Sequence, residues 1–133
     1  MEQIARVPCV LVVDDDLANL RVFERVFRRD FEVVTAPSGA AAVAALDRFD
    51  PDVAFVDFRM PGMDGAAVLA ALHRLHPTTT CFLLTGYGDL AETQALVEGG
   101  LCVGVLTKPW DRAAIRSAVH GVVGVSERQA SAG

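Results

Sequence analysis

The chain has 133 residues, of which 52% are hydrophobic and 22% are charged, and this fits one compact domain with its own core. The formal net charge of −5 excludes a protein that grips nucleic acid through its own surface, because such a surface needs clustered Lys and Arg. No apolar run approaches the roughly 18 residues of a membrane span, and residues 1–6 lack the apolar stretch of a signal peptide.

Short runs rich in β-branched residues alternate along the chain with Ala- and Leu-rich segments of helical period. In chain order they predict a strand at 9–13, a helix at 17–28, a strand at 31–35, a helix after Ser38, a strand at 53–56, a helix after Asp64 that stops before Pro77, a strand at 80–84, a helix at 90–98, a strand at 103–106 and a helix at 112–123. Strands that alternate with helices in this way predict an α/β domain with a doubly wound, five-stranded parallel sheet. The polar segment 126–133 is expected to be a frayed, flexible tail or the start of a linker.

The three cysteines point to a reducing environment. Cys9, Cys81 and Cys102 lie in apolar runs and show no C-x-x-C spacing, which is typical of reduced core thiols. Together with the lack of a membrane span, this predicts a soluble cytoplasmic protein.

Polar side chains follow four of the predicted strands. Asp14 and Asp15 follow the first, Asp57 the third, Thr85 the fourth and Lys108 the fifth. The carboxyl ends of parallel strands meet at one edge of a sheet, which is where open α/β sheets bind ligands. We therefore expect these side chains to form one site.

The chemistry of that site follows from its charges. Three carboxylates at one edge would repel one another unless a cation joined them, and an all-oxygen site suits Mg²⁺. Lys108 adds a positive charge and Thr85 a hydroxyl donor, the groups that hold phosphoryl oxygens. The pattern indicates phosphoryl chemistry. Taken singly, each of these residues could instead be a turn, capping or solvated loop residue.

Other titratable residues are expected to lie outside the site. Asp50 and Asp52 precede the third predicted strand and so belong at the opposite edge, as turn residues. His73, His76 and His120 lie on helices away from the site edge, and we expect them at the surface.

Four segments together resemble a known family: VVDDD at 12–16, VDFRMPGMDG at 56–65, LTGY at 84–87 and TKPW at 107–110. They are similar to the motifs of response-regulator receiver domains of bacterial two-component systems, and the resemblance covers residues 7–125. It implies a flavodoxin-like fold with strand order 2-1-3-4-5. It also implies a cis peptide between Lys108 and Pro109.

The resemblance assigns roles to the acidic residues. Asp57 would be the phosphoacceptor, and Asp15 and Asp57 would ligate Mg²⁺ directly. The backbone carbonyl of Arg59 would be a third ligand, and Asp14 would act through bound water. We add the hypothesis that the Arg59 side chain screens the phosphoryl group from water.

The resemblance also implies how the signal is received and passed on. Lys108 would pair with the phosphoryl group and Thr85 would move in to hydrogen-bond it. The donor would be a sensor histidine kinase or a phosphotransfer protein. The output would be a changed interaction through the fourth helix, fifth strand and fifth helix, with an output domain, an effector or a second copy of the chain. The aromatic residue common three positions before the lysine is here Val105, so this chain departs from the family's aromatic switch; Tyr87 or a partner would fill the space.

Such a protein would be no enzyme beyond catalysing its own phosphorylation and slow dephosphorylation. One alternative is a haloacid-dehalogenase-like phosphatase that uses Asp14, Asp16, Thr85 and Lys108. Against it stand the short chain, the missing acidic pair after the lysine and the unexplained loop at Asp57. A second alternative is an interaction module that works without phosphorylation.

Overall fold

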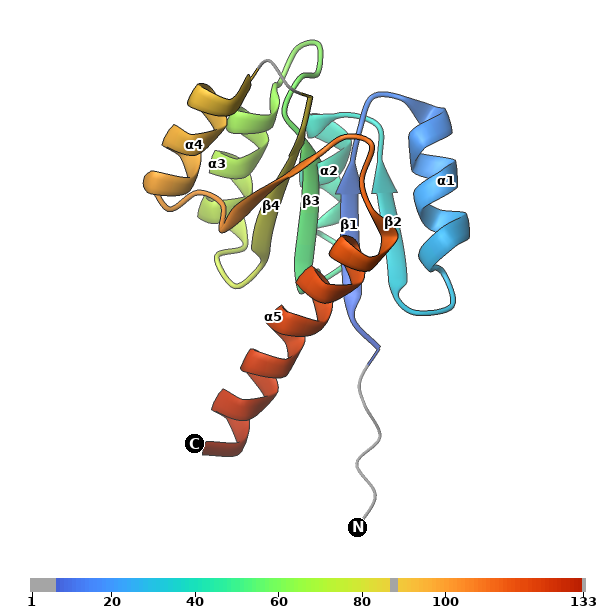
Figure 1. Cartoon of the computed structure of the whole chain (residues 1–133), viewed down its shortest axis with the longest axis vertical. Helices are drawn as coiled ribbons and strands as arrows, with labels where there is room; N and C mark the ends of the chain where they lie inside the picture. Colours follow the sequence, from blue (N-terminus) through green and yellow to red (C-terminus); the bar gives the residue numbers. More distant parts are fainter. Residues whose placement is uncertain (1–6, 87–88, 133) are drawn as a thin grey trace.

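The computed structural model describes residues 7–86 and 89–132. Five strands alternate with five helices along the chain (Figure 1). The elements are β1 (Cys9–Val13), α1 (Leu17–Phe27), β2 (Glu32–Ala36), α2 (Gly39–Ala45), β3 (Val53–Asp57), α3 (Gly65–Leu75), β4 (Thr80–Thr85), α4 (Leu90–Glu98), β5 (Gly104–Thr107) and α5 (Arg112–Ala132). No helix in this described part of the chain is both long enough and apolar enough to cross a membrane.

The five strands form one parallel sheet in the order β2-β1-β3-β4-β5. This confirms the doubly wound α/β fold and the flavodoxin-like strand order. The chain leaves β1 toward β2 on one side and returns to β3 on the other. The carboxyl ends of β1 and β3 therefore lie next to each other at the point where the winding reverses, the usual place for a ligand in such sheets.

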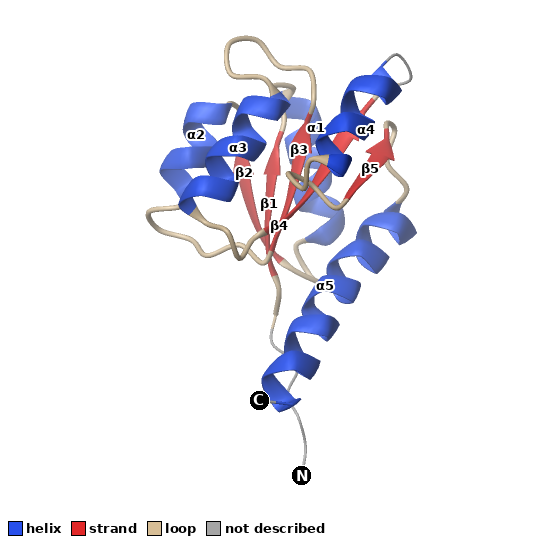
Figure 2. Cartoon of the chain, turned by 90° about the vertical axis from the view of Figure 1, so that its left-hand side faces the viewer, coloured by secondary structure: helices blue, strands red, loops and turns tan. Residues whose placement is uncertain are grey.

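Apolar side chains fill both faces of the sheet, so the strands are buried on two sides. Helices α2 and α3 cover one face and α5 lies across the other, as Figure 2 shows. The core between the sheet and α1 and α5 is rich in aromatic rings: Phe23, Phe27, Phe31 and Phe55, with Phe82 and Trp110 at its margin. Rigid strands held between two cores can fix side chains at their ends in constant positions.

The N-termini of three helices are capped as the sequence predicts or allows. Ser38 Oγ accepts from the backbone N–H of Ala41 at 3.1 Å, and Asp64 Oδ1 accepts from Ala67 at 3.0 Å. Asp16 caps α1 in the same way. Each such bond satisfies a backbone donor that the helix itself cannot pair.

Several predicted boundaries were wrong by small amounts. Strand β2 begins at Glu32, because the backbone N–H of Phe31 still bonds to Phe27 at the end of α1 and its ring joins the aromatic core. Strand β5 begins at Gly104; Val103, predicted as its first residue, is 61% exposed.

The largest difference lies at the C-terminus. Helix α5 was predicted to end at residue 123, but it continues to Ala132, so the predicted boundary is wrong and residues 126–132 are helical. That this end of the chain is flexible stays a prediction. Helical period in an apolar stripe marks only the packed turns of a helix, and α5 continues where that stripe stops. That a linker starts here stays a prediction.

The start of α3 leaves no room for a side chain at Gly65. A Cβ there would lie 2.7 Å from the backbone oxygen of Asp57 and 2.7 Å from Cα of Phe58. We expect Gly65→Ala to lower the free energy of unfolding by about 1–3 kcal/mol, because the backbone must shift to relieve the overlap. Urea unfolding measures the change.

Gly121 provides the matched control, since it lies inside α5 and a Cβ there meets nothing within 4 Å. Gly121→Ala should raise the free energy of unfolding by about 0.5–1 kcal/mol, because Ala favours the helix over Gly. Equal stabilities of the two variants would contradict the close approach at Gly65.

Candidate functional site

The carboxyl edge of the sheet gathers the predicted side chains from four strands. Asp14 directly follows β1, Asp57 ends β3, Thr85 ends β4 and Lys108 directly follows β5. The last two are joined through their backbones, because the N–H of Lys108 donates to the carbonyl of Thr85 at 2.8 Å. The predicted meeting of these strand ends is therefore confirmed.

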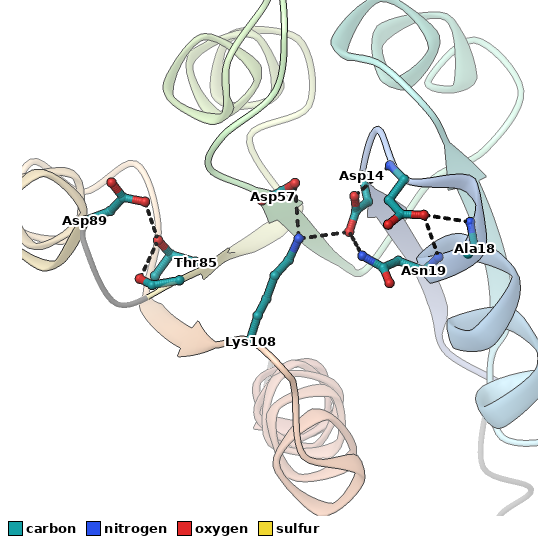
Figure 3. Close-up of polar contacts among 9 residues, drawn as sticks. Asp14, Ala18, Asn19, Asp57, Thr85, Asp89 and Lys108 are labelled. Atoms are coloured by element: carbon teal, nitrogen blue, oxygen red, sulfur yellow. Dashed lines mark hydrogen bonds and ion pairs between the residues drawn. The ribbon is translucent and has the colours of Figure 1, made fainter.

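Lys108 bridges the two buried carboxylates of this edge. Its Nζ lies 3.1 Å from Asp14 Oδ2 and 3.2 Å from Asp57 Oδ2 (Figure 3). Asp14 and Asp57 are 3% and 6% exposed. Burial alone would lower the pKa of Lys108, but its hydrogen bonds with both aspartates and their charges outweigh burial and raise the pKa. Lys108 is therefore a stable cation at neutral pH.

Asp14, Asp15 and Asp57 form an acidic cluster. Each offers a carboxylate oxygen, and the three oxygens lie within 4.8 Å of one another; Asp15 is exposed. Three negative charges face the single ammonium group of Lys108. The donors are all oxygen, which is the ligand set of a hard divalent cation such as Mg²⁺. These residues therefore fit a magnesium site.

The carboxylate of Asp57 is strained electrostatically. Burial raises its pKa, Lys108 lowers it by charge and hydrogen bond, and the charge of Asp14 raises it again, with a net rise. An anion in this position gains from any added cation.

Asp14 is bonded more completely than Asp57. Its Oδ1 accepts from the backbone N–H of Asp16 at 2.9 Å, and its Oδ2 accepts from Asn19 Nδ2 at 3.2 Å as well as from Lys108. The role of Asn19 was missed from the sequence. Its position in the first turn of α1, beside the predicted site edge, was the available signal.

Thr85 lies at the site edge, but its side chain turns away from the carboxylates of Asp14 and Asp57. The hydroxyl lies 3.1 Å from Asp89 Oδ2 and 3.2 Å from the backbone oxygen of Gly86 (Figure 3). Asp89, just before α4, was also missed, because nothing in its local sequence links it to Thr85.

The Arg59 side chain is bound away from Asp57. Its Nε donates to Asp89 Oδ1 at 2.9 Å, Nη2 contacts the same oxygen, and the guanidinium also reaches Glu92 Oε1 at 3.4 Å. The guanidinium carbon lies 5.5 Å from the centre of the Phe58 ring. The hypothesis that Arg59 screens a phosphoryl group stays a prediction, as does the ligand role of its backbone carbonyl.

The other titratable residues lie away from the acidic cluster, as predicted, but His76, which was expected at the surface, is half-buried. At the opposite edge, His76 Nε2 pairs with Asp50 at 2.8 Å, and Asp52 accepts from the backbone N–H of Cys9. His73 and His120 are exposed. Neither group reaches the acidic cluster.

Several smaller predictions also have outcomes. The three cysteines are free and buried, and the Lys108–Pro109 peptide is cis, as expected. The Trp110 ring packs on Phe23 and Phe27 of α1, with ring centres 5.5 and 5.4 Å apart. Tyr87 lies outside the described residues. Val105 is half-buried and packs against the core on the α2, α3 and α4 side of the sheet.

Comparisons with known proteins agree with this geometry. The family model described as "Response regulator receiver domain" matches residues 10–120. Transcriptional regulatory protein GlrR of Escherichia coli (strain K12) is 33% identical over 111 residues, which are 83% of this chain and 25% of that protein. The chain thus spans about a quarter of the length of this relative.

Two further matches cover nearly whole proteins. Sporulation initiation phosphotransferase F of Bacillus subtilis (strain 168) is 30% identical over 83% of this chain and 89% of its own length. The structure of a response regulator receiver domain protein (CheY-like) from Methanospirillum hungatei JF-1 superposes with a TM-score of 0.84. It covers 93% of this chain and 99% of that one at 22% identity, so it supports the fold alone.

The raised pKa of Asp57 makes stability depend on pH. Below pH 3.8, its ordinary value, the carboxyl is protonated in the folded and unfolded chain alike. As pH rises from there through the raised pKa, the unfolded chain releases the proton first and stability falls. At pH 7 without divalent cations, Asp57→Asn should therefore be more stable than the wild type, by about 1.4 kcal/mol for each unit that the pKa is raised.

Urea unfolding at pH 7 and near pH 4 measures this difference, which should shrink at the lower pH. Asp47→Asn is the control, since Asp47 is exposed and away from the cluster, and it should change stability by less than about 0.5 kcal/mol. If the wild type had the higher free energy of unfolding at pH 7, the ionised Asp57 would not destabilise the folded chain and the prediction would be wrong.

Proposed function

The chain belongs to the family of response regulator receiver domains, and we propose that it is a signalling switch in which Asp57 accepts a phosphoryl group. The observation that carries this proposal is the position of Lys108 Nζ, between the carboxylates of Asp14 and Asp57. A cation there can neutralise phosphoryl oxygens while Asp57 attacks.

The bonding of the two aspartates favours Asp57 as the nucleophile. Both oxygens of Asp14 already accept hydrogen bonds, from Asp16, Asn19 and Lys108. Asp57 accepts hydrogen bonds from Lys108 and from the backbone N–H of Arg59. An Asp57 oxygen forms the new bond to phosphorus, and the bond from phosphorus to the donor's histidine nitrogen breaks, with the nitrogen keeping the electron pair. Such transfer depends mainly on positioning and charge neutralisation.

The acidic cluster is the proposed Mg²⁺ site. Asp15, Asp57 and the backbone carbonyl of Arg59 would bind the ion directly, and Asp14 would act through water. When bound, Mg²⁺ neutralises the charge that builds up on the phosphoryl oxygens. The excess of three carboxylates over one ammonium group supports this assignment.

The proposed output starts from the charge that phosphorylation adds at Asp57. A phosphoryl group adds a charge of about −1.5 to −2 at neutral pH, and its oxygens need a further donor besides Lys108. Thr85, which ends β4, would supply its hydroxyl, and the change would pass to the α4-β5-α5 face. Val105, in β5, stands where the usual aromatic residue would be, so the switch would work without that aromatic ring.

The proposed partners follow from the same assignment. A sensor histidine kinase or phosphotransfer protein would donate the phosphoryl group in the cytoplasm, and the switched face would contact an output domain, an effector or a second copy of the chain. The protein would catalyse only its own phosphorylation and slow dephosphorylation.

The phosphatase alternative fits the geometry poorly. Its scheme needs Asp14 as the nucleophile and Asp16 as the acid, but Asp16 is exposed and caps α1 instead. A module that works without phosphorylation leaves the buried carboxylates unexplained, since buried like charges cost stability.

Labelling with acetyl phosphate tests the proposal. We expect the wild type to take up one phosphoryl group on Asp57 in the presence of Mg²⁺ and none in its absence, because the cluster repels the anionic donor until a cation binds. Asp57→Ala should take up none, by mass spectrometry. Label on Asp14, in the wild type or in Asp57→Ala, would overturn the assignment in favour of the phosphatase scheme.

Mg²⁺ itself should stabilise the folded chain, because only the folded chain gathers Asp14, Asp15 and Asp57. At a free Mg²⁺ concentration ten times its Kd, the free energy of unfolding should rise by about 1.4 kcal/mol. Asp15→Asn should lose most of this gain, whereas Asp47→Asn should keep it. The measurement is urea unfolding with and without the ion; equal gains in the two variants would count against the site.

A further inference from the structure

Asp89 stands at the N-cap position of α4 but does not cap the helix. Its carboxylate makes no side-chain capping hydrogen bond to the described residues. The N-cap residues of α1, α2 and α3, which are Asp16, Ser38 and Asp64, all accept a backbone N–H with their side chains. A capping bond favours a helix, and Asp is among the best residues for it. The Asp89 carboxylate is therefore engaged by something else.

That engagement is with Thr85 and Arg59. One oxygen, Oδ2, accepts from the Thr85 hydroxyl at 3.1 Å, and the other, Oδ1, accepts from Arg59 Nε at 2.9 Å. Asp89 is 7% exposed. The side-chain acceptor for Thr85 is therefore a carboxylate paired with a guanidinium, and the backbone oxygen of Gly86 lies 3.2 Å from the same hydroxyl.

A threonine hydroxyl has one hydrogen and can donate it to one strong acceptor at a time. Hydrogen bonds to an ionised acceptor are stronger than those to a neutral one. Figure 3 shows Thr85 turned toward Asp89, with Lys108 and Asp57 on its other side. To reach a phosphoryl group on Asp57, Thr85 must first give up Asp89.

We propose that Asp89 is a positioning residue that holds the Thr85 hydroxyl away from Asp57 until a phosphoryl group competes for it. Arg59, on the loop that follows Asp57, orients the Asp89 carboxylate so that it can bind the Thr85 hydroxyl. The inference rests on the proposed function of Asp57.

Release of Thr85 has a consequence at α4. The Asp89 carboxylate, still bound by Arg59 through Oδ1, has a free oxygen once Thr85 leaves. The backbone N–H groups of the first turn of α4 are donors of the kind that the other N-cap residues use. The segment therefore has two states: in one, Asp89 binds Thr85, and in the other, Asp89 caps α4. A switch requires two such linked states.

The test measures the binding of beryllofluoride, a mimic of the phosphoryl group, in the presence of Mg²⁺. Asp89→Ala should bind it about tenfold more tightly than the wild type. In this variant Thr85 does not have to break its hydrogen bond with Asp89 first, and the loss of one such bond corresponds to a change in affinity of about that size. Asp89→Asn, which keeps the shape and a neutral acceptor, should fall in between. In a Thr85→Ala background, Asp89→Ala should change nothing.

Glu92→Gln is the matched control, since Glu92 contacts the same Arg59 at 3.4 Å and makes no contact with Thr85 in the described structure. It should bind beryllofluoride as the wild type does. A second readout is the methyl resonance of Thr85. In Asp89→Ala without beryllofluoride it should move toward its position in the beryllofluoride-bound wild type, which a general loss of packing would not cause.

The outcomes separate this inference from the proposed function. If the wild type binds beryllofluoride at Asp57 but Asp89→Ala binds it no more tightly, or gains equally in the Thr85→Ala background, the hold is overturned and the function stands. If the wild type does not bind it, or if binding survives Asp57→Ala, both are overturned.

Discussion

Two buried carboxylates that share one ammonium group are the constraint on which the rest of this edge depends. Asp14 and Asp57 lie side by side because β1 and β3 are neighbours in the sheet, and Lys108 reaches both from β5. With Asp15 nearby the local charge is negative, and burial raises the pKa of Asp57. The folded chain tolerates this excess of negative charge, and a bound cation would reduce it.

The fold supplies the rigidity that this imbalance needs. Each central strand is buried on both faces, so its end cannot shift without disturbing a packed core. Asp14 and Asp57 therefore stay close together, and the backbone cannot move apart to relieve the repulsion between them. Thr85 is buried at the end of β4, and its hydroxyl contacts a carboxylate and a backbone carbonyl at the start of the next loop. In the proposed switch, this hydroxyl is the group that changes partner.

The sequence predicted the parts of the site that depend on strand ends. Asp14, Asp57, Thr85 and Lys108 each follow or close a short apolar run, and parallel pairing brings such ends together whatever the detailed packing. Asn19 and Asp89 were not found, because their roles depend on which face of α1 and which rotation of the α4 start lie over the edge. For Asn19, its position in the first turn of the predicted helix was the one available signal, and for Asp89 the local sequence offered none.

The same distinction explains the errors in the elements. Phe31 looks like a strand residue, but its backbone closes the last turn of α1 and its ring stacks on Phe27, which only the tertiary structure decides. The end of α5 was placed where its apolar stripe stops, although a helix can continue beyond the turns that pack.

The aromatic core under α1 has a consequence for observing the molecule. Trp110 is the only tryptophan of the chain, it is two residues from Lys108, and its ring lies on Phe23 and Phe27. Its fluorescence therefore comes from one known place, joined by two peptide links to the cation that bridges Asp14 and Asp57. The protein carries its own optical probe beside the site, so events at the acidic cluster can be followed in solution without attaching a dye.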